Sequence, residues 1–354
     1  MSSLLGIIIG LGVLLETQGC AAPGKHYYQL EQQLARHNYQ AADSIVEDNK
    51  AKYGARNAVL YDLDRAMTLH LAGRYAESNA FLFKAEARID RLYTKSISAG
   101  VGAMLSNDLL LPYEGEDFEK VQLNLIAALN YAYLREGDEA LVEARKVDLK
   151  LTAYNDRYAT KNVYKEDAFA RYLSGILYEA QGELNDAFIA YRKALEAYET
   201  YQEHYGTRFP SALPADLLRV TQALGLREEY KTYRRRFPGV GYETIQALRG
   251  KGELVYISYN GFAPLKQSYA ISAPVPTSKG QPVYILRVAF PRFVPRPSAI
   301  AYAKLRVSRG TQQYTTRTST VQDLTAIARK NLEDRIGRIR VKALARAVAK
   351  YLAA

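Results

Sequence analysis

The sequence predicts an α+β fold in which a solenoid of paired helices precedes a small β-rich domain and a C-terminal helix. Three observations carry this prediction: helical spacing of apolar residues with recurring turn glycines over residues 24–238, strand-like alternation after residue 245, and helical spacing again from residue 320. With 354 residues, 48% of them hydrophobic, the chain has material for two domains with real cores. We place the boundaries at 1–19 for a signal peptide, 20–240 for the helical repeats, and 245–354 for a basic β-rich domain with a C-terminal amphipathic helix.

The only cysteine, Cys20, follows a short uncharged apolar run over residues 4–15. At about 1.5 Å per residue this run covers roughly 18 Å, which is too short to cross a hydrocarbon core of about 30 Å. Gly19 and Cys20 fit the cleavage and lipidation point of a bacterial lipoprotein precursor, whereas Thr17 and Gln18 differ from its usual residues and residues 1–3 lack the usual Lys or Arg. We interpret Cys20 as a lipid attachment site. The alternative is a buried N-terminal helix with an ordinary core cysteine.

A lipid on Cys20 would fix the location of the protein. Cleavage before Cys20 frees its amine for a further acyl chain, and two or more chains anchor a protein stably. Ala21 stands where an Asp retains many Gram-negative lipoproteins at the inner membrane. The expected location is therefore the periplasmic face of the outer membrane, with no second cysteine available for a disulfide.

Residues 172–198 have the spacing of a tetratricopeptide (TPR) repeat, the clearest repeat in the chain. In such a repeat small residues let the paired helices approach closely, tyrosines fill the space between them, and a glycine permits the tight turn. Six positions match in one register: Gly175, Tyr178, Gly182, Ala187, Tyr191 and Ala194. The helical part is thus predicted to be an irregular TPR-like α-solenoid, a fold that offers an extended surface to partners.

Looser copies surround this repeat. Residues 69–79 repeat the turn with Gly73, and residues 130–140 repeat it with Gly137, which stands two places late. Residues 34–42 and 223–230 are candidate end repeats. Successive turn glycines are 64, 45 and 43 residues apart rather than about 34, which indicates inserted segments.

The longest insertion, residues 96–120, carries a group of acidic residues. These are Glu114, Glu116, Asp117 and Glu119. Their spacing is not that of a calcium loop, so we expect a solvated loop rather than a metal site. Tyr113 and Phe118 are expected to fold over the face of the repeats.

After residues 237–241 the apolar pattern changes to period two. Strands are predicted over 253–259, 283–290, 299–307 and 313–318, with turns at Asn260-Gly261 and Arg309-Gly310. A helix is predicted from Thr320, where Thr320 and Asp323 can form a capping box. Its apolar face should dock on the β domain. A helix lying on a membrane surface is the alternative, because its polar face is rich in Lys and Arg.

The net charge of +11 is concentrated at the C-terminal end. Residues 286–354 contain fifteen Lys and Arg against three acidic residues, a net charge of +12. An exported protein is not expected to meet nucleic acid, so anionic lipid or the acidic groups of peptidoglycan are the partners that this charge favours. An ordinary solvated face of a basic domain remains the other interpretation.

No catalytic, cofactor-binding or metal-binding site is predicted. The histidines, His26, His37, His70 and His204, are scattered, and His70 is expected to be a packing residue beside a repeat turn. The sequence has neither a Gly-x-Ser-x-Gly motif nor a phosphate-binding loop. A glycosidase would need facing carboxylates, for which Glu116 and Asp117 with Glu166 or Asp167 are the candidates, and nothing in the pattern favours them.

Six segments taken together resemble an uncharacterised family of bacterial outer-membrane lipoproteins with TPR-like repeats. They are Cys20, residues 69–79, 94–98, 111–120, 172–198 and 288–297. The resemblance covers almost the whole chain and implies a location and an architecture rather than a reaction. Members of that family tend to continue past the last residue of this sequence. Their neighbourhood includes envelope lipoproteins related to activators of peptidoglycan synthesis.

The expected function is therefore that of a membrane-anchored, non-enzymatic lipoprotein scaffold. In this interpretation Cys20 holds the chain at the outer membrane, and the repeats bind a protein partner in the cell envelope. The alternative is a peptidoglycan-binding module, or a regulator of peptidoglycan synthesis, that uses the basic C-terminal domain. No cofactor is expected in either case.

Overall fold

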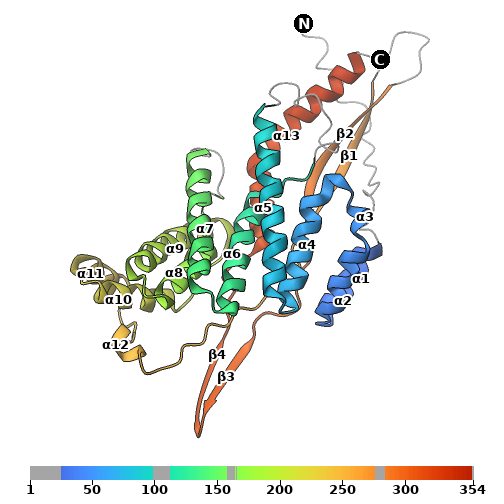
Figure 1. The fold of residues 1–354 in the computed structure, drawn as a ribbon. Helices are drawn as coiled ribbons and strands as arrows, with labels where there is room; N and C mark the ends of the chain where they lie inside the picture. Colours follow the sequence, from blue (N-terminus) through green and yellow to red (C-terminus); the bar gives the residue numbers. More distant parts are fainter. Residues whose placement is uncertain (1–24, 99–111, 158–163, 165, 276–283, 353–354) are drawn as a thin grey trace.

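The computed structural model describes residues 25–98, 112–157, 164, 166–275 and 284–352. The predicted signal peptide and Cys20 lie outside these residues. Paired helices come first along the chain, and two antiparallel strand pairs and a long helix follow them (Figure 1). The predicted fold class, a TPR-like solenoid followed by a small β-rich part and a C-terminal helix, is confirmed.

Five helical hairpins form the solenoid in the described part of the chain. Their turns place one residue in the left-handed region, which is glycine in three hairpins and His37 or Arg135 in the other two. The pairs are α1 (Lys25–Ala35) with α2 (Tyr39–Asp48), α4 (Ala58–Leu71) with α5 (Tyr75–Ser98), α6 (Asp117–Leu134) with α7 (Gly137–Arg157), α8 (Ala168–Ala180) with α9 (Leu184–Tyr205), and α10 (Leu213–Ala223) with α11 (Arg227–Arg236). Short helices α3 (Lys50–Tyr53), η1 (Ala55–Asn57) and α12 (Ile245–Leu248) complete the helical part.

One buried core cluster runs from α4 to α11 and combines tyrosines and alanines with leucines and valines. Residues from the C-terminal part pack against the same cluster, among them Ile257, Phe293 and Leu324. Ile327 of the last helix is fully buried in it. The strands and the C-terminal helix are therefore held on the solenoid by shared apolar contacts.

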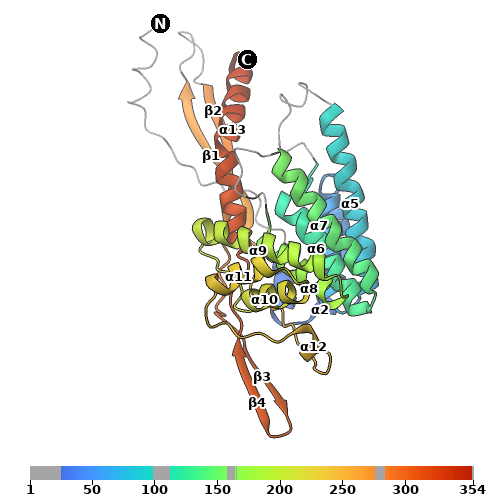
Figure 2. The same cartoon turned by 90° about the vertical axis from the view of Figure 1, so that its left-hand side faces the viewer.

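The longer strand pair consists of β1 (Leu265–Val275) and β2 (Tyr284–Val294) in antiparallel register, with Leu265 opposite Val294. The last helix, α13 (Leu324–Leu352), covers one face of this ribbon. Ala343 and Ala347 of α13 are buried against Val288 and Phe290 of β2. The predicted docking of the helix on the β part is thus present, but Ala343 and Ala347 make this contact, whereas Leu344 and Val348 of the predicted docking face are exposed. Figure 2 shows the ribbon and α13 running side by side.

The predicted strand over 253–259 is wrong. These residues are extended but have no strand partner, and Ile257 packs on the helical core while Leu254 and Val255 remain exposed. The period-two pattern of the sequence could not separate a strand from an extended segment that contacts helices at one residue. The first strand, β1, begins six residues later.

The remaining strand predictions agree with β2, β3 (Lys304–Arg309) and β4 (Gln312–Arg317) apart from their ends. Strands β3 and β4 form a hairpin that projects from the molecule at the end opposite to the β1–β2 ribbon (Figures 1 and 2). Gly310 lies in the turn between β3 and β4 with a φ of 58°. The predicted capping box at Thr320 is wrong, because α13 begins at Leu324 and Asp323 caps it by accepting a hydrogen bond from the Ala326 backbone N–H at 2.9 Å.

Among the described residues, no helix combines the length and the apolar character that crossing a bilayer requires.

Candidate functional site

The TPR-like spacing of residues 172–198 corresponds to a tightly packed hairpin of α8 and α9. A Cβ atom placed on Gly175 would lie 2.4 Å from the ring of Tyr191, so glycine permits this helix contact. The Tyr191 hydroxyl donates to Glu179 at 2.7 Å. Ala187 and Ala194 are fully buried, Tyr178 is 6% exposed, and Gly182 takes the turn with a φ of 81°. These residues build the repeat, and all of them except the exposed Gly182 are buried within it.

The turn between α6 and α7 differs from the turn that the sequence predicted. Arg135 occupies the left-handed position with a φ of 63°, and Gly137 is the first residue of α7. A Cβ on Gly137 would lie 2.2 Å from the Gln181 side-chain amide nitrogen. The displaced glycine therefore lies where the exposed Gln181 side chain of the next repeat approaches the start of α7, and the prediction that it takes the turn is wrong.

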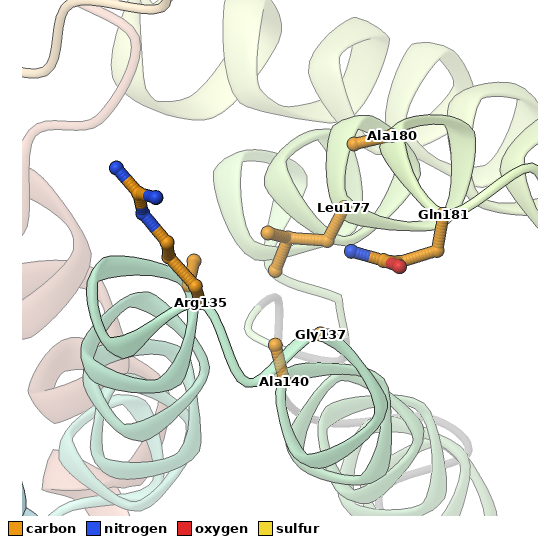
Figure 3. A pocket seen from close by; sticks show the side chains of 7 residues that line it. Arg135, Gly137, Ala140, Leu177, Ala180 and Gln181 are labelled. Carbon is orange, nitrogen blue, oxygen red and sulfur yellow. The ribbon is translucent and has the colours of Figure 1, made fainter.

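A pocket of about 340 Å³ lies beside this contact, between the α6–α7 turn and the C-terminal end of α8 (Figure 3). Its floor is apolar, and Leu177 points from α8 towards the turn. The exposed Arg135 and Gln181 are its polar lining residues. The complete lining is Ala132, Arg135, Gly137, Ala140, Leu177, Ala180 and Gln181.

Aromatic residues extend the exposed surface near the α6–α7 turn. Tyr133, in the last turn of α6, is 55% exposed and stacks on Tyr75 with ring centroids 4.7 Å apart. Leu134 is also exposed. An exposed tyrosine, an arginine and an apolar pocket are the composition that protein-binding surfaces favour.

Three buried polar groups of the solenoid hold the C-terminal part of the chain in place. The first is His70 at the end of α4, whose Nε2 lies 3.1 Å from the Tyr259 hydroxyl. Its Nδ1 lies 2.6 Å from Oδ1 of Asn130, and the Asn130 amide donates to Ser78 and Asn79. Burial lowers the pKa of His70, and in the neutral ring Nδ1–H donates to Asn130 while Nε2 accepts from Tyr259.

The second group is Glu116, at the start of α6. Its carboxylate accepts from Lys266 of β1 at 2.5 Å and from Arg335 of α13 at 2.7 Å. Burial alone would raise the pKa of Glu116, but the two cations outweigh burial and lower it. The same carboxylate therefore binds the ribbon and the last helix together.

The neighbours of Glu116 contradict the prediction of a solvated acidic loop. Glu119 accepts from the Glu116 backbone N–H at 2.7 Å and from the Tyr113 hydroxyl, and Asp117 is buried beside Lys120. Only Glu114 is exposed. Helix α6 begins inside the predicted loop, so the acidic residues at its start cap the helix or form ion pairs. The acidic composition of the loop gave no indication of this helix boundary.

The third group is Asp167, the N-cap of α8. It accepts from the Ala170 backbone N–H at 2.8 Å, from Tyr164 at 2.8 Å and from Gln122 at 3.2 Å. The Gln322 amide, just before α13, reaches both of its oxygens at 3.0 and 2.8 Å. Burial raises the pKa of Asp167, although these hydrogen bonds act to lower it.

The carboxylates considered for glycoside hydrolysis thus have structural partners. Glu166 pairs with Arg171 at 2.7 Å, and the partners of Glu116, Asp117 and Asp167 are those given above. In the described ranges no group of His, Cys, Asp and Glu side chains could hold a metal ion.

No family model matches the sequence, and no curated protein matches it. Among solved structures it is similar to MamA, with 15% identity, a TM-score of 0.36 and coverage of 58% of this chain and 91% of that chain. For BtubC from P. vanneervenii the identity is 15%, the TM-score 0.40 and the coverage 66% and 86%. It is also similar to a putative kinesin light chain of Podosopora anserina with TPR-like repeats. The identity is 12%, the TM-score is 0.37, and the match covers 60% of this chain and 90% of that chain. The repeats are assigned here from the contacts within the chain, because likenesses this weak carry no argument about function.

Sequence reasoning did not find the pocket. Arg135, Leu177 and Gln181 match no motif, since their role comes from the stacking of two repeats. One signal was present: Gly137 stands two places away from the expected turn position. A glycine that is not needed for a turn indicates that another part of the chain approaches closely.

Proposed function

We propose that the protein is a non-enzymatic scaffold of the bacterial cell envelope, anchored to the outer membrane through Cys20, whose repeats bind a protein partner. The pocket between the α6–α7 turn and α8 is the observation that supports partner binding most directly. It is an apolar pocket with an exposed arginine at its edge, on a solenoid in which His70, Glu116 and Asp167 already bind the C-terminal part of the chain itself.

The lining of the pocket suggests what the partner presents. Ala132, Ala140, Leu177 and Ala180 suit an apolar side chain of modest size. The Arg135 guanidinium suits a carboxylate next to that side chain, since arginine binds carboxylates through two parallel hydrogen bonds. We therefore infer a peptide segment with an apolar residue beside Asp or Glu.

Filling the pocket tests this proposal. Ala180, the last residue of α8, is exposed, so Ala180→Trp should block the pocket without disturbing the core. Ala223, the exposed last residue of α10, occupies the same place in the next repeat, and Ala223→Trp is the matched control. Partner protein should co-purify with the control and the wild type but not with Ala180→Trp. Equal recovery with all three would refute binding at this pocket.

The anchor has a separate test. Cells grown with a radioactive fatty acid should label the wild-type chain and not Cys20→Ser, because the thiol is the attachment point. Equal labelling of the two chains would exclude this anchor. This result is independent of partner binding at the pocket.

Binding to the cell wall is a second candidate function, favoured by the absence of acidic residues from the β part. From Leu254 to Gln322 the sequence has no Asp or Glu, and the β3–β4 hairpin exposes Lys304, Arg306, Arg309 and Arg317. Such a surface should pellet with purified peptidoglycan at low salt and be released as salt screens the charges. A chain that stays in the supernatant at low salt would remove this candidate.

A further inference from the structure

The second half of α13 carries an exposed apolar stripe. Val341, Leu344 and Val348 are 69%, 48% and 49% exposed. Because successive helical residues are about 100° apart, these three lie within an arc of about 60°. Ala343 and Ala347, which pack on the ribbon, are centred about 110° from the stripe around the helix axis. The apolar stripe (Val341, Leu344 and Val348) therefore lies beside the face that packs on the ribbon and is about half or more exposed.

Two cations of α13 flank the apolar stripe. Arg338 and Arg340 are exposed on its two sides. After Asp334 the sequence contains no further Asp or Glu, whereas Lys and Arg recur up to Lys350. The result is an apolar strip with a basic border.

The position of this half of α13 suits a flat surface. In both views its end runs with the β1–β2 ribbon past the upper end of α5, at the end of the molecule opposite to the β3–β4 hairpin (Figures 1 and 2). A planar partner could therefore reach the end of α13 without first meeting the solenoid.

We propose that the apolar stripe and its flanking arginines form a site for an anionic lipid bilayer surface, on which the second half of α13 lies. An interfacial helix buries its apolar residues at the boundary of headgroups and acyl chains while Lys and Arg bind anionic headgroups. Charge complementarity distinguishes this occupant from a second copy of the chain, whose equally basic stripe would be repelled. The site is independent of Cys20 and of the pocket, so it would add a second membrane contact to the proposed scaffold.

The full chain carrying Cys20→Ser provides the test, because it cannot be acylated. It should float with vesicles of equal parts phosphatidylglycerol and phosphatidylcholine, and not with phosphatidylcholine alone. Replacing Val341, Leu344 and Val348 together by Ser should weaken this binding about tenfold or more, since three apolar contacts are lost. Val142→Ser with Leu149→Ser, two exposed apolar residues of α7, is the control that should bind as the parent does.

Fluorescence reports insertion directly, because the natural sequence has no Trp. Emission from Leu344→Trp should shift to shorter wavelength when anionic vesicles are added, and emission from Leu149→Trp should not. Circular dichroism of each variant checks that it is folded.

Several results would overturn the proposal. These are failure of the parent chain to float, equal flotation with neutral vesicles, or undiminished binding by the folded triple Ser variant. A dimer in solution that the triple Ser variant dissociates would identify the stripe as a self-interface instead. Binding to peptidoglycan but not to vesicles would assign the basic region to the cell wall.

Discussion

Arg335 of α13 donates to the carboxylate of Glu116 at 2.7 Å, across 219 positions of sequence. The same carboxylate binds Lys266 of β1, so one side chain of the solenoid holds both the ribbon and the last helix. The C-terminal part of the chain is thus bound to the repeats at a defined point, and the contact can be removed by a conservative substitution.

Glu116→Gln should destabilise the protein by about 1–3 kcal/mol, because two charged hydrogen bonds are weakened and two cations lose their partner. Hydrogen exchange should increase first in the early turns of α13 and in β1. Glu228→Gln, which removes an exposed ion pair with Lys231, is the control and should change stability little. Unchanged exchange in α13 would show that Glu116 does not hold it.

Gly175→Ala should destabilise the protein by about 1–3 kcal/mol through overpacking, because its new Cβ meets the Tyr191 ring at 2.4 Å. The Cβ of Gly250→Ala would lie in open space, so this substitution should change the stability little. Thermal unfolding of both variants gives the comparison. A Gly175→Ala variant as stable as Gly250→Ala would contradict the packing described for α8 and α9.

Asp64 should give stability a measurable dependence on pH. Its Oδ2 accepts from Tyr27 at 2.9 Å and Tyr53 at 2.8 Å, and burial raises its pKa to about 6 against these hydrogen bonds. Between about pH 4 and pH 6 the folded state therefore keeps a proton that the unfolded state has lost. This contribution to stability grows as the pH falls from 6 to 4, and it reaches at most about 3 kcal/mol.

Asp64→Asn keeps an acceptor for the tyrosines and removes the titration. Denaturant unfolding at several pH values should show a flatter profile for the variant than for the wild type between pH 4 and pH 6. The free energy of unfolding of the variant, relative to that of the wild type, should be highest near pH 7. Parallel profiles over this range would mean that Asp64 titrates normally.

Asp167→Ala should be among the most damaging single substitutions in the solenoid, costing about 3 kcal/mol or more. It leaves the donors of Tyr164, Gln122 and Gln322 without their acceptor in a buried site and removes the cap of α8. Asp167→Asn keeps part of the acceptor capacity and should cost less. Equal effects of the two substitutions on the free energy of unfolding would argue against a hydrogen-bonding role.

The repeats were predictable from the sequence because their packing is local. A glycine such as Gly175 and a tyrosine such as Tyr191 lie in one hairpin, and their spacing follows from helix geometry. The strand over 253–259 was predicted wrongly, since pairing depends on a partner strand that local alternation does not identify. Likewise, composition suggested that Glu116 was solvated, because its partners Lys266 and Arg335 lie far along the chain.

The pocket was beyond sequence reasoning for a related reason. It exists where Gln181 of one repeat approaches Gly137 of another, and neither residue has a pattern of its own. The apolar stripe of α13 illustrates the converse case. Helical spacing indicated that Leu344 and Val348 belong to a face that docks on the β part, but the packing of Ala343 and Ala347 on the ribbon leaves both exposed.

The most direct test of the proposed scaffold is photocrosslinking in cells from a single photoreactive residue. Placed at Ala180, beside the pocket, it should yield one dominant adduct with an envelope protein. Placed at Ala223, the equivalent position of the next repeat, it should yield little. Indistinguishable adducts from the two positions, or none from Ala180, would contradict partner binding at the pocket.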